Sequence, residues 1–159
     1  MLVTPSTHAP FRRRQLLAAF LSAGAVLGAG LVSAAPAQAA TLGQSVVVEA
    51  SHHVGQPYVY GAAGPTRFDC SGFTQYVFGR FGRHLPRTTS SQYSWAYMHH
   101  ISASSKAPGD LIFMRDSSGV IYHVGIYAGS NTWWVAPHTG AYVKRQTLYS
   151  TNYSVGRVY

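Results

Sequence analysis

The sequence predicts an α+β domain, with N-terminal helices packed on an antiparallel sheet of five or six strands. Apolar side chains of residues 73–81 recur at helical spacing, whereas those of residues 111–137 form short runs or alternate as in strands. Turn residues, many of them glycine, separate the later segments, as hairpins require. Helices therefore come first along the chain and strands follow, which favours two segregated layers.

Residues 1–39 have the organisation of an export signal. Arg12–Arg14 carry positive charge, residues 16–32 form an uncharged run rich in Ala, Leu and Gly, and Ala37-Gln38-Ala39 fits a signal peptidase site. The uncharged run is short for a membrane span and contains three glycines. We expect cleavage before Ala40 and no stable membrane insertion afterwards, with export by the general route or by the twin-arginine route that the paired arginines resemble.

Residues 40–159 are long enough for one compact domain, which we expect to be monomeric. They contain nine lysines and arginines against four carboxylates, and the basic residues are scattered rather than clustered. Nucleic-acid binding is therefore not expected. The positive charge suits either an anionic target, such as a cell-wall polymer, or plain solubility.

Three segments are expected to form helices. Residues 44–54 form the first. The second has Cys70 in its first turn, because Asp69 is a good N-cap, and is ended by the turn-rich residues 79–86. Thr88 or Thr89 is expected to cap the third.

Strands are predicted at residues 111–114, 122–128, 132–137, 141–144 and 154–159. The histidine pairs at 52–53 and 99–100 are expected at the surface. No cysteine or carboxylate is spaced to complete a zinc set with them, so we predict neither a metal site nor a cofactor.

Cys70 is the only cysteine of the sequence. An exported protein with one cysteine has no internal disulfide partner, and a helix start favours a thiolate, so Cys70 is predicted to be a nucleophile rather than a buried filler. Of the seven histidines after residue 40, His123 lies within a predicted strand of the sheet, which makes it the expected base.

Four motifs occur in order, at residues 55–61, 68–73, 108–113 and 123–127. Together they closely resemble the NlpC/P60 family, over almost all of residues 50–159. The resemblance implies a papain-like fold and a secreted cysteine peptidase of the bacterial cell wall, with residues 40–159 as the catalytic domain. It also implies peptidoglycan as the partner, since many members cut the bond from γ-D-glutamate to a diamino acid in its stem peptides.

By position, the resemblance implies that Cys70 is the nucleophile and His123 the general base. It implies that Tyr58 assists substrate or oxyanion binding, and that Asp69 and Ser71 flank the substrate pocket. The expected reaction passes through an acyl-enzyme that water hydrolyses.

The sequence departs from the family at the third catalytic position. The family usually has a polar residue, often His, twelve positions after the base, and Val135 stands there. His138 is the nearest polar substitute, although strand alternation places it on the face opposite His123 unless a bulge or the strand end at Pro137 intervenes. If His138 is the orienting group, His138→Ala lowers turnover strongly. Otherwise a backbone carbonyl or a water orients His123, or activity is weak.

Three alternatives stay open on the same fold. The alternatives to the peptidase are an N-acetylmuramoyl-L-alanine amidase acting at the sugar–peptide junction, a transferase with an acceptor other than water, and a wall-binding domain with a weakened triad. The alternatives differ in their products and in the reactivity of Cys70.

Overall fold

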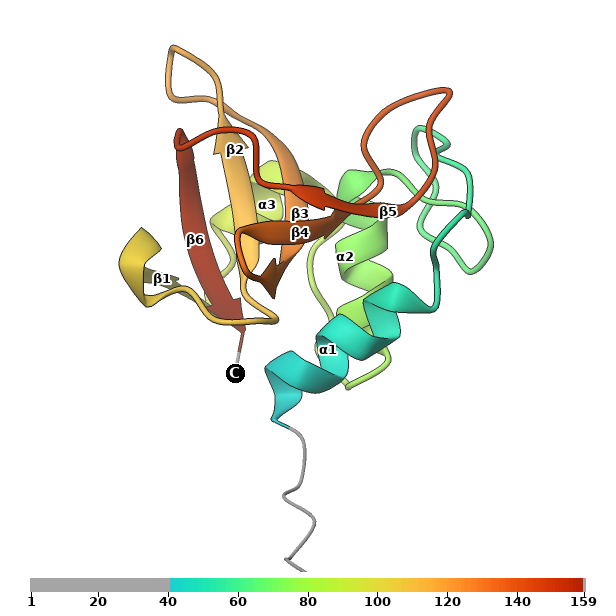
Figure 1. Cartoon of the computed structure of the whole chain (residues 1–159), viewed down its shortest axis with the longest axis horizontal. Helices are drawn as coiled ribbons and strands as arrows, with labels where there is room; N and C mark the ends of the chain where they lie inside the picture. The colour runs from blue at the N-terminus through green and yellow to red at the C-terminus, as the bar shows by residue number, and fades with distance from the viewer. Residues whose placement is uncertain (1–40, 159) are drawn as a thin grey trace, which may run out of the picture. The chain divides into compact units, whose positions relative to one another are not determined.

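The computed structural model describes residues 41–158, in which helices pack on a six-stranded antiparallel sheet (Figure 1). The strand order is β1-β6-β2-β3-β4-β5. This confirms the predicted α+β architecture. The elements are α1 (Leu42–Ser51), α2 (Cys70–Gly79), α3 (Thr89–Tyr93), β1 (Met98–Ile101), the 3-10 turn η1 (Ala103–Ser105), β2 (Leu111–Arg115), β3 (Ile121–Gly129), β4 (Thr132–Val135), β5 (Lys144–Thr147) and β6 (Tyr153–Val158).

Apolar side chains cover both faces of the central strands. In β2, Leu111 and Phe113 pack in the cluster that joins the helices to the sheet, whereas Ile112 and Met114 pack in a second cluster on the other face. Successive side chains of a strand point to opposite faces, so residues 111–114 of β2 are buried on both faces of the sheet. The second cluster also contains Tyr127, Trp133, Val135, Leu148 and Val155.

The starts of α2 and α3 agree with the sequence predictions, whereas α1 begins two residues earlier and ends three residues earlier than predicted. The Asp69 side chain accepts the Gly72 N–H at the start of α2, and the Thr88 side chain accepts the Ser91 N–H at the start of α3. In α1, however, the buried residues are Val46 and Ala50. The sequence pattern places Val47, Val48, Ser51 and Val54 on one packing side, but Val48 and Val54 are exposed, so this expectation was wrong by part of a turn.

Three parts of the sheet differ from the prediction. Strand β4 ends at Val135 and not at residue 137. Strand β5 begins at Lys144 and runs to Thr147, because Tyr142 instead forms an isolated bridge with Pro57. Strand β1 was not predicted, since the pair His99-His100 reads as polar surface, yet it pairs with the edge of β6. In the described residues, no helix is long and apolar enough to cross a membrane.

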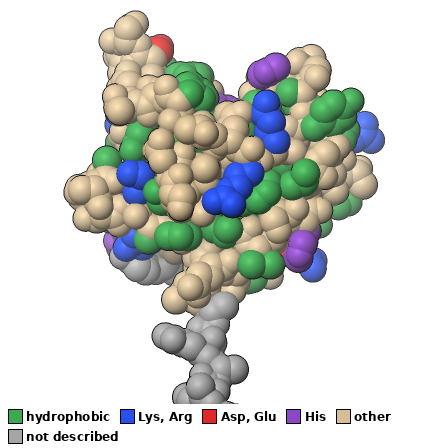
Figure 2. Space-filling model, in the orientation of Figure 1, with side chains coloured by type: hydrophobic (Ala, Val, Ile, Leu, Met, Phe, Trp, Pro, Cys, Tyr) green, Lys and Arg blue, Asp and Glu red, His purple; other side chains and the backbone are tan. Residues whose placement is uncertain are grey.

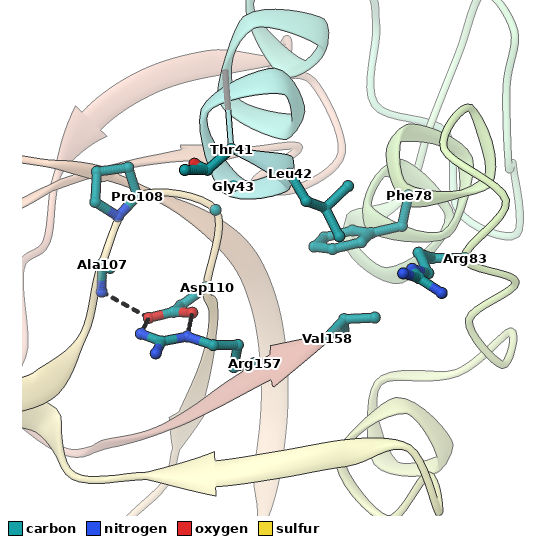
Figure 3. Close-up of a pocket in the computed structure, with 11 residues that line it drawn as sticks. Thr41, Leu42, Gly43, Phe78, Arg83, Ala107, Pro108, Asp110, Arg157 and Val158 are labelled. Carbon is teal, nitrogen blue, oxygen red and sulfur yellow. Dashed lines mark hydrogen bonds and ion pairs between the residues drawn. The ribbon is translucent and has the colours of Figure 1, made fainter. Parts of the chain in front are cut away.

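The turn before β2 is fixed against α1 by two glycines. A Cβ on Gly43 would lie 2.2 Å from the Pro108 carbonyl oxygen, and one on Gly109 would lie 2.2 Å from the Gly43 Cα. Asp110, which is buried, accepts hydrogen bonds from the Ala107 N–H and from Arg157 (Figure 3). The motif at residues 108–113 therefore has a structural role, because it connects the start of β2 to α1 and to β6.

Candidate active site

The first turn of α2 is fixed by one carboxylate. Asp69 accepts the Gly72 N–H at 2.7 Å through Oδ1 and the Gly61 N–H at 2.9 Å through Oδ2, and Arg87 donates to both oxygens. Burial alone would raise the pKa of Asp69, but the hydrogen bonds from Arg87, Gly72 and Gly61 outweigh it and hold this pKa below its ordinary value. Asp69 is thus an anion that fixes Cys70 as the first residue of the helix.

Arg87 also reaches Ser71, whose hydroxyl accepts from Nη1 at 3.1 Å. Asp69 and Ser71, expected beside the substrate pocket, border a hollow next to Cys70 but are themselves buried and bonded to Arg87. Sequence reasoning missed Arg87. A buried carboxylate at a helix N-cap needs a cation close to it, and this was the available signal. The sequence does not say which of the nine lysines and arginines provides that cation.

The sulfur of Cys70 has a hydroxyl neighbour. Its Sγ lies 3.6 Å from Oγ1 of Thr89, at the start of α3. Gln92 ties the two helices together: its Nε2 donates to the carbonyls of Ser71 (2.8 Å) and Pro86 (2.9 Å), and its Oε1 accepts from Thr74 (2.8 Å). Because Gln92 is fully buried and bonded at both ends of its amide, it holds Thr89 beside the sulfur.

His123 lies near the start of β3, opposite Met114 and next to a register shift in the β2–β3 pairing. It is 8% exposed, and its ring meets that of Trp133 edge-on, with centroids 5.5 Å apart. Burial, with a smaller contribution from the charge of His138, lowers the pKa of His123 from 6.5 to about 4. At neutral pH the ring is therefore uncharged and able to take up a proton.

Residue 135, the third catalytic position of the resemblance described above, does not hold a polar group. Val135 is completely buried and packs in the same apolar cluster as Trp133. His138 is exposed, and its Nδ1 lies 2.9 Å from the Thr139 carbonyl oxygen, to which an Nδ1–H can donate. Within residues 41–158 no hydrogen bond joins His138 to His123, so the effect of His138 on His123 is electrostatic.

Cys70 lies where two hollows of one cleft meet. The larger, of about 600 Å³, is also lined by His123, His138 and Lys144. The smaller, of about 440 Å³, is lined by Arg87 and other residues near the start of α3. Among the described residues, no group of three His, Cys, Asp or Glu side chains is arranged to hold a metal ion.

Tyr58 lines both hollows, as Cys70 does. Burial raises the pKa of Tyr58, and the neighbouring Cys70 and Asp69 raise it further. The hydroxyl therefore keeps its proton at neutral pH and can donate it in a hydrogen bond. Tyr122 borders both hollows as well and was not predicted from the sequence.

Residues 55–156 match the sequence model of the NlpC/P60 family. The chain belongs to the NlpC/P60 family. The probable endopeptidase p60 of Listeria innocua is 51% identical over 86 residues, which cover 54% of this chain but 18% of that protein. The gamma-DL-glutamyl hydrolase of Bacillus subtilis is 39% identical over 110 residues, or 67% of this chain and 25% of that one. The chain thus spans a quarter or less of these curated relatives.

A solved NlpC/p60 domain has the same fold over nearly its whole length. The crystal structure of this domain of the peptidoglycan hydrolase SagA superimposes with a TM-score of 0.64 and 37% sequence identity, covering 73% of this chain and 97% of that one. In the present NlpC/P60 domain, the motifs around Tyr58, Cys70 and His123 build the cleft. The motif around Asp110 borders a separate hollow that shares no residue with the cleft.

Proposed function

We propose that this NlpC/P60 domain is a cysteine peptidase that hydrolyses amide bonds in peptidoglycan stem peptides, at the bond from γ-D-glutamate to a diamino acid. The observation that carries the proposal is that Cys70, at a capped helix start, and His123, a buried neutral imidazole, line the same cleft. The names of the relatives, which include endopeptidases and a gamma-DL-glutamyl hydrolase, support the choice of bond.

In the proposed reaction Cys70 attacks the substrate and His123 transfers the protons. His123 takes the proton of the Cys70 thiol as the sulfur attacks the amide carbon, and the oxyanion forms near the free N–H groups at the start of α2. The Tyr58 hydroxyl donates a further hydrogen bond, and each such donor is worth roughly 3 kcal/mol in the transition state. The protonated His123 then gives its proton to the leaving amine, and water hydrolyses the thioester.

His138 is the polar side chain that we propose to act in place of the residue missing at Val135. It lines the same hollow as His123. Its positive charge lowers the pKa of His123, so the role we propose for it is to position the ring and not to stabilise the protonated form. Asp69, Ser71 and Arg87 form the wall of the second hollow, in which we place the glutamyl side of the substrate.

We further propose that the chain acts outside the cell, at the wall, as a monomer. The proposed location rests on the signal-like residues 1–39, which lie outside the described residues, and on relatives such as the peptidoglycan hydrolase SagA. The excess of positive charge in residues 40–159 suits an anionic polymer.

Digestion of defined muropeptides, with mass spectrometry of the products, tests the proposal. We expect products from cleavage between D-glutamate and the diamino acid, and none with Cys70→Ala or His123→Ala. His84→Ala is a matched control, because His84 is exposed and lines neither hollow of the cleft. Release of the intact stem peptide from the sugar would instead show an amidase, and products joined to an added amine would show a transferase.

A wall-binding domain without activity is the second candidate, and buried Val135 is the observation that favours it. Alkylation of the thiol separates the two. If Cys70 reacts rapidly with iodoacetamide below pH 8 and His123→Ala slows that reaction, the catalytic pair is functional. A slow reaction that is unaffected by His123→Ala, together with binding to purified wall, would favour the binding domain.

A further inference from the structure

The larger hollow of the cleft is lined by one lysine and by no carboxylate. Lys144 of β5 lines it together with His123 and Cys70. The face of the molecule shown in Figure 2 carries several Lys and Arg side chains and hardly any acidic ones. Lys144 is exposed and forms no ion pair with any residue that the structure describes.

All four carboxylates of the chain are engaged elsewhere. Glu49 contacts His52, His53 and Arg80; Asp69 binds Arg87; Asp110 binds Arg157; and Asp116 accepts the N–H groups of Ser118 and Val120 in its own turn. None of these four side chains lines the hollow that contains Lys144, and none forms an ion pair with it. The charge is free for an external anion.

The register of the sheet places Lys144 on the face that carries the base. Lys144 pairs with Val135, and His123 pairs with Met114. Val135 and Met114 lie in the same apolar cluster, and directly paired residues of antiparallel strands point to the same face. Lys144 and His123 therefore share one face and line one hollow.

The position of His123 fixes which part of a substrate meets Lys144. In the proposed reaction the protonated ring must reach the leaving nitrogen, so the leaving residue lies in the hollow that contains His123. His123 lines the larger hollow and not the smaller one. The amine product of the reaction is thus released on the side of Lys144.

We propose that Lys144 selects substrates whose leaving residue carries a free carboxylate, and discriminates against the corresponding carboxamide. An ammonium group attracts a carboxylate by charge and donates to it, whereas a carboxamide offers no charge. This inference rests on the proposed peptidase function and adds the ionisation state of the leaving residue to it. Gln146, in the same hollow, can hydrogen-bond either form and so does not discriminate.

The test uses two peptides, L-Ala–γ-D-Glu–diaminopimelate with free carboxylates on the leaving residue, and the same peptide with those groups as carboxamides. The readout is the ratio of kcat/KM for the acid to that for the amide, measured within each variant of the full chain. We expect the wild type to prefer the acid roughly 3- to 10-fold. Lys144→Met should bring the ratio close to one, and Lys144→Arg should retain most of the preference.

Arg145→Met is the matched control. Arg145 is the next residue of β5, pairs with Trp134 on the opposite face and lines neither hollow. The substitution Arg145→Met removes a positive charge from the same strand as Lys144→Met does. It should leave the ratio of kcat/KM for the acid to that for the amide as in the wild type. An unchanged ratio in Lys144→Met, or an equal fall in both variants, would overturn the role of Lys144 while the peptidase stands. If neither peptide is cleaved by the wild type, the proposed function fails and this inference fails with it.

Discussion

The buried ring of His123 makes the stability of the fold depend on pH. Its pKa is about 4 in the folded protein, against 6.5 for an ordinary histidine. The folded state therefore favours the neutral ring, and the unfolded chain binds the proton more tightly. The stabilisation is complete above pH 6.5 and is lost progressively as the pH falls from 6.5 to 4.

The size of the effect follows from the shift. A difference of about 2.5 pKa units at 1.36 kcal/mol per unit lowers the free energy of unfolding by about 3 kcal/mol at pH 4 and below. His123 is 8% exposed, so solvent screening reduces this figure little. Asp69 titrates in a lower window, because its pKa is held below 3.8 and its contribution is lost as the pH falls through that lowered value.

Urea denaturation at pH 7 and pH 4 measures the effect, with His123→Gln as the reference because an amide does not titrate. We expect the free energy of unfolding of the wild type to fall by about 3 kcal/mol more than that of His123→Gln over this interval. NMR titration of the His123 ring should give a midpoint near 4. Equal losses in the two proteins, or a ring midpoint near 6.5, would refute the burial of a neutral imidazole.

Three further substitutions test the groups around Cys70. Thr89→Val removes the hydroxyl beside the sulfur and should slow both iodoacetamide alkylation and turnover by roughly 3- to 10-fold, with Thr89→Ser restoring both; an unaffected rate would exclude this contact. His138→Ala should raise the pKa of His123, followed by NMR, and should still lower kcat strongly because the ring loses the side chain proposed to position it; a rate near that of the wild type would remove His138 from the site. Arg87→Met leaves the Asp69 carboxylate without its cation and should destabilise the fold by about 2–3 kcal/mol in urea denaturation; a loss below about 0.5 kcal/mol would show that the pair is unimportant.

Local features of the fold were predictable from the sequence. The N-cap at Asp69 and the helical spacing after it place Cys70 in a first turn, and both signals act over a few residues. The turn between β3 and β4 was equally predictable, because Gly129-Ser130-Asn131 are turn-forming residues between two apolar segments. In the structure Ser130 and Asn131 adopt positive φ angles of 49° and 55° there.

Partners that are distant in the sequence were not predictable. Arg87 binds Asp69 across 18 positions, and Gln92 binds the carbonyl of Ser71 across 21. Nothing in the local pattern selects one arginine or one glutamine for such a contact, because packing of the helices decides it. His53, expected at the surface, is 7% exposed and packs edge-on against aromatic rings for the same reason.

The apolar residue at position 135 and the low pKa of His123 have a common physical origin. A polar acceptor near the ring would stabilise its protonated form, whereas Trp133 and Val135 make this side of the sheet apolar and disfavour it. The ring is therefore neutral before the reaction and strongly acidic once it has taken a proton. Such a group is a weak base toward the Cys70 thiol but a strong acid toward the leaving amine. The geometry thus favours expulsion of the amine and makes formation of the thiolate the demanding step, in which the hydroxyl of Thr89 and the start of α2 assist.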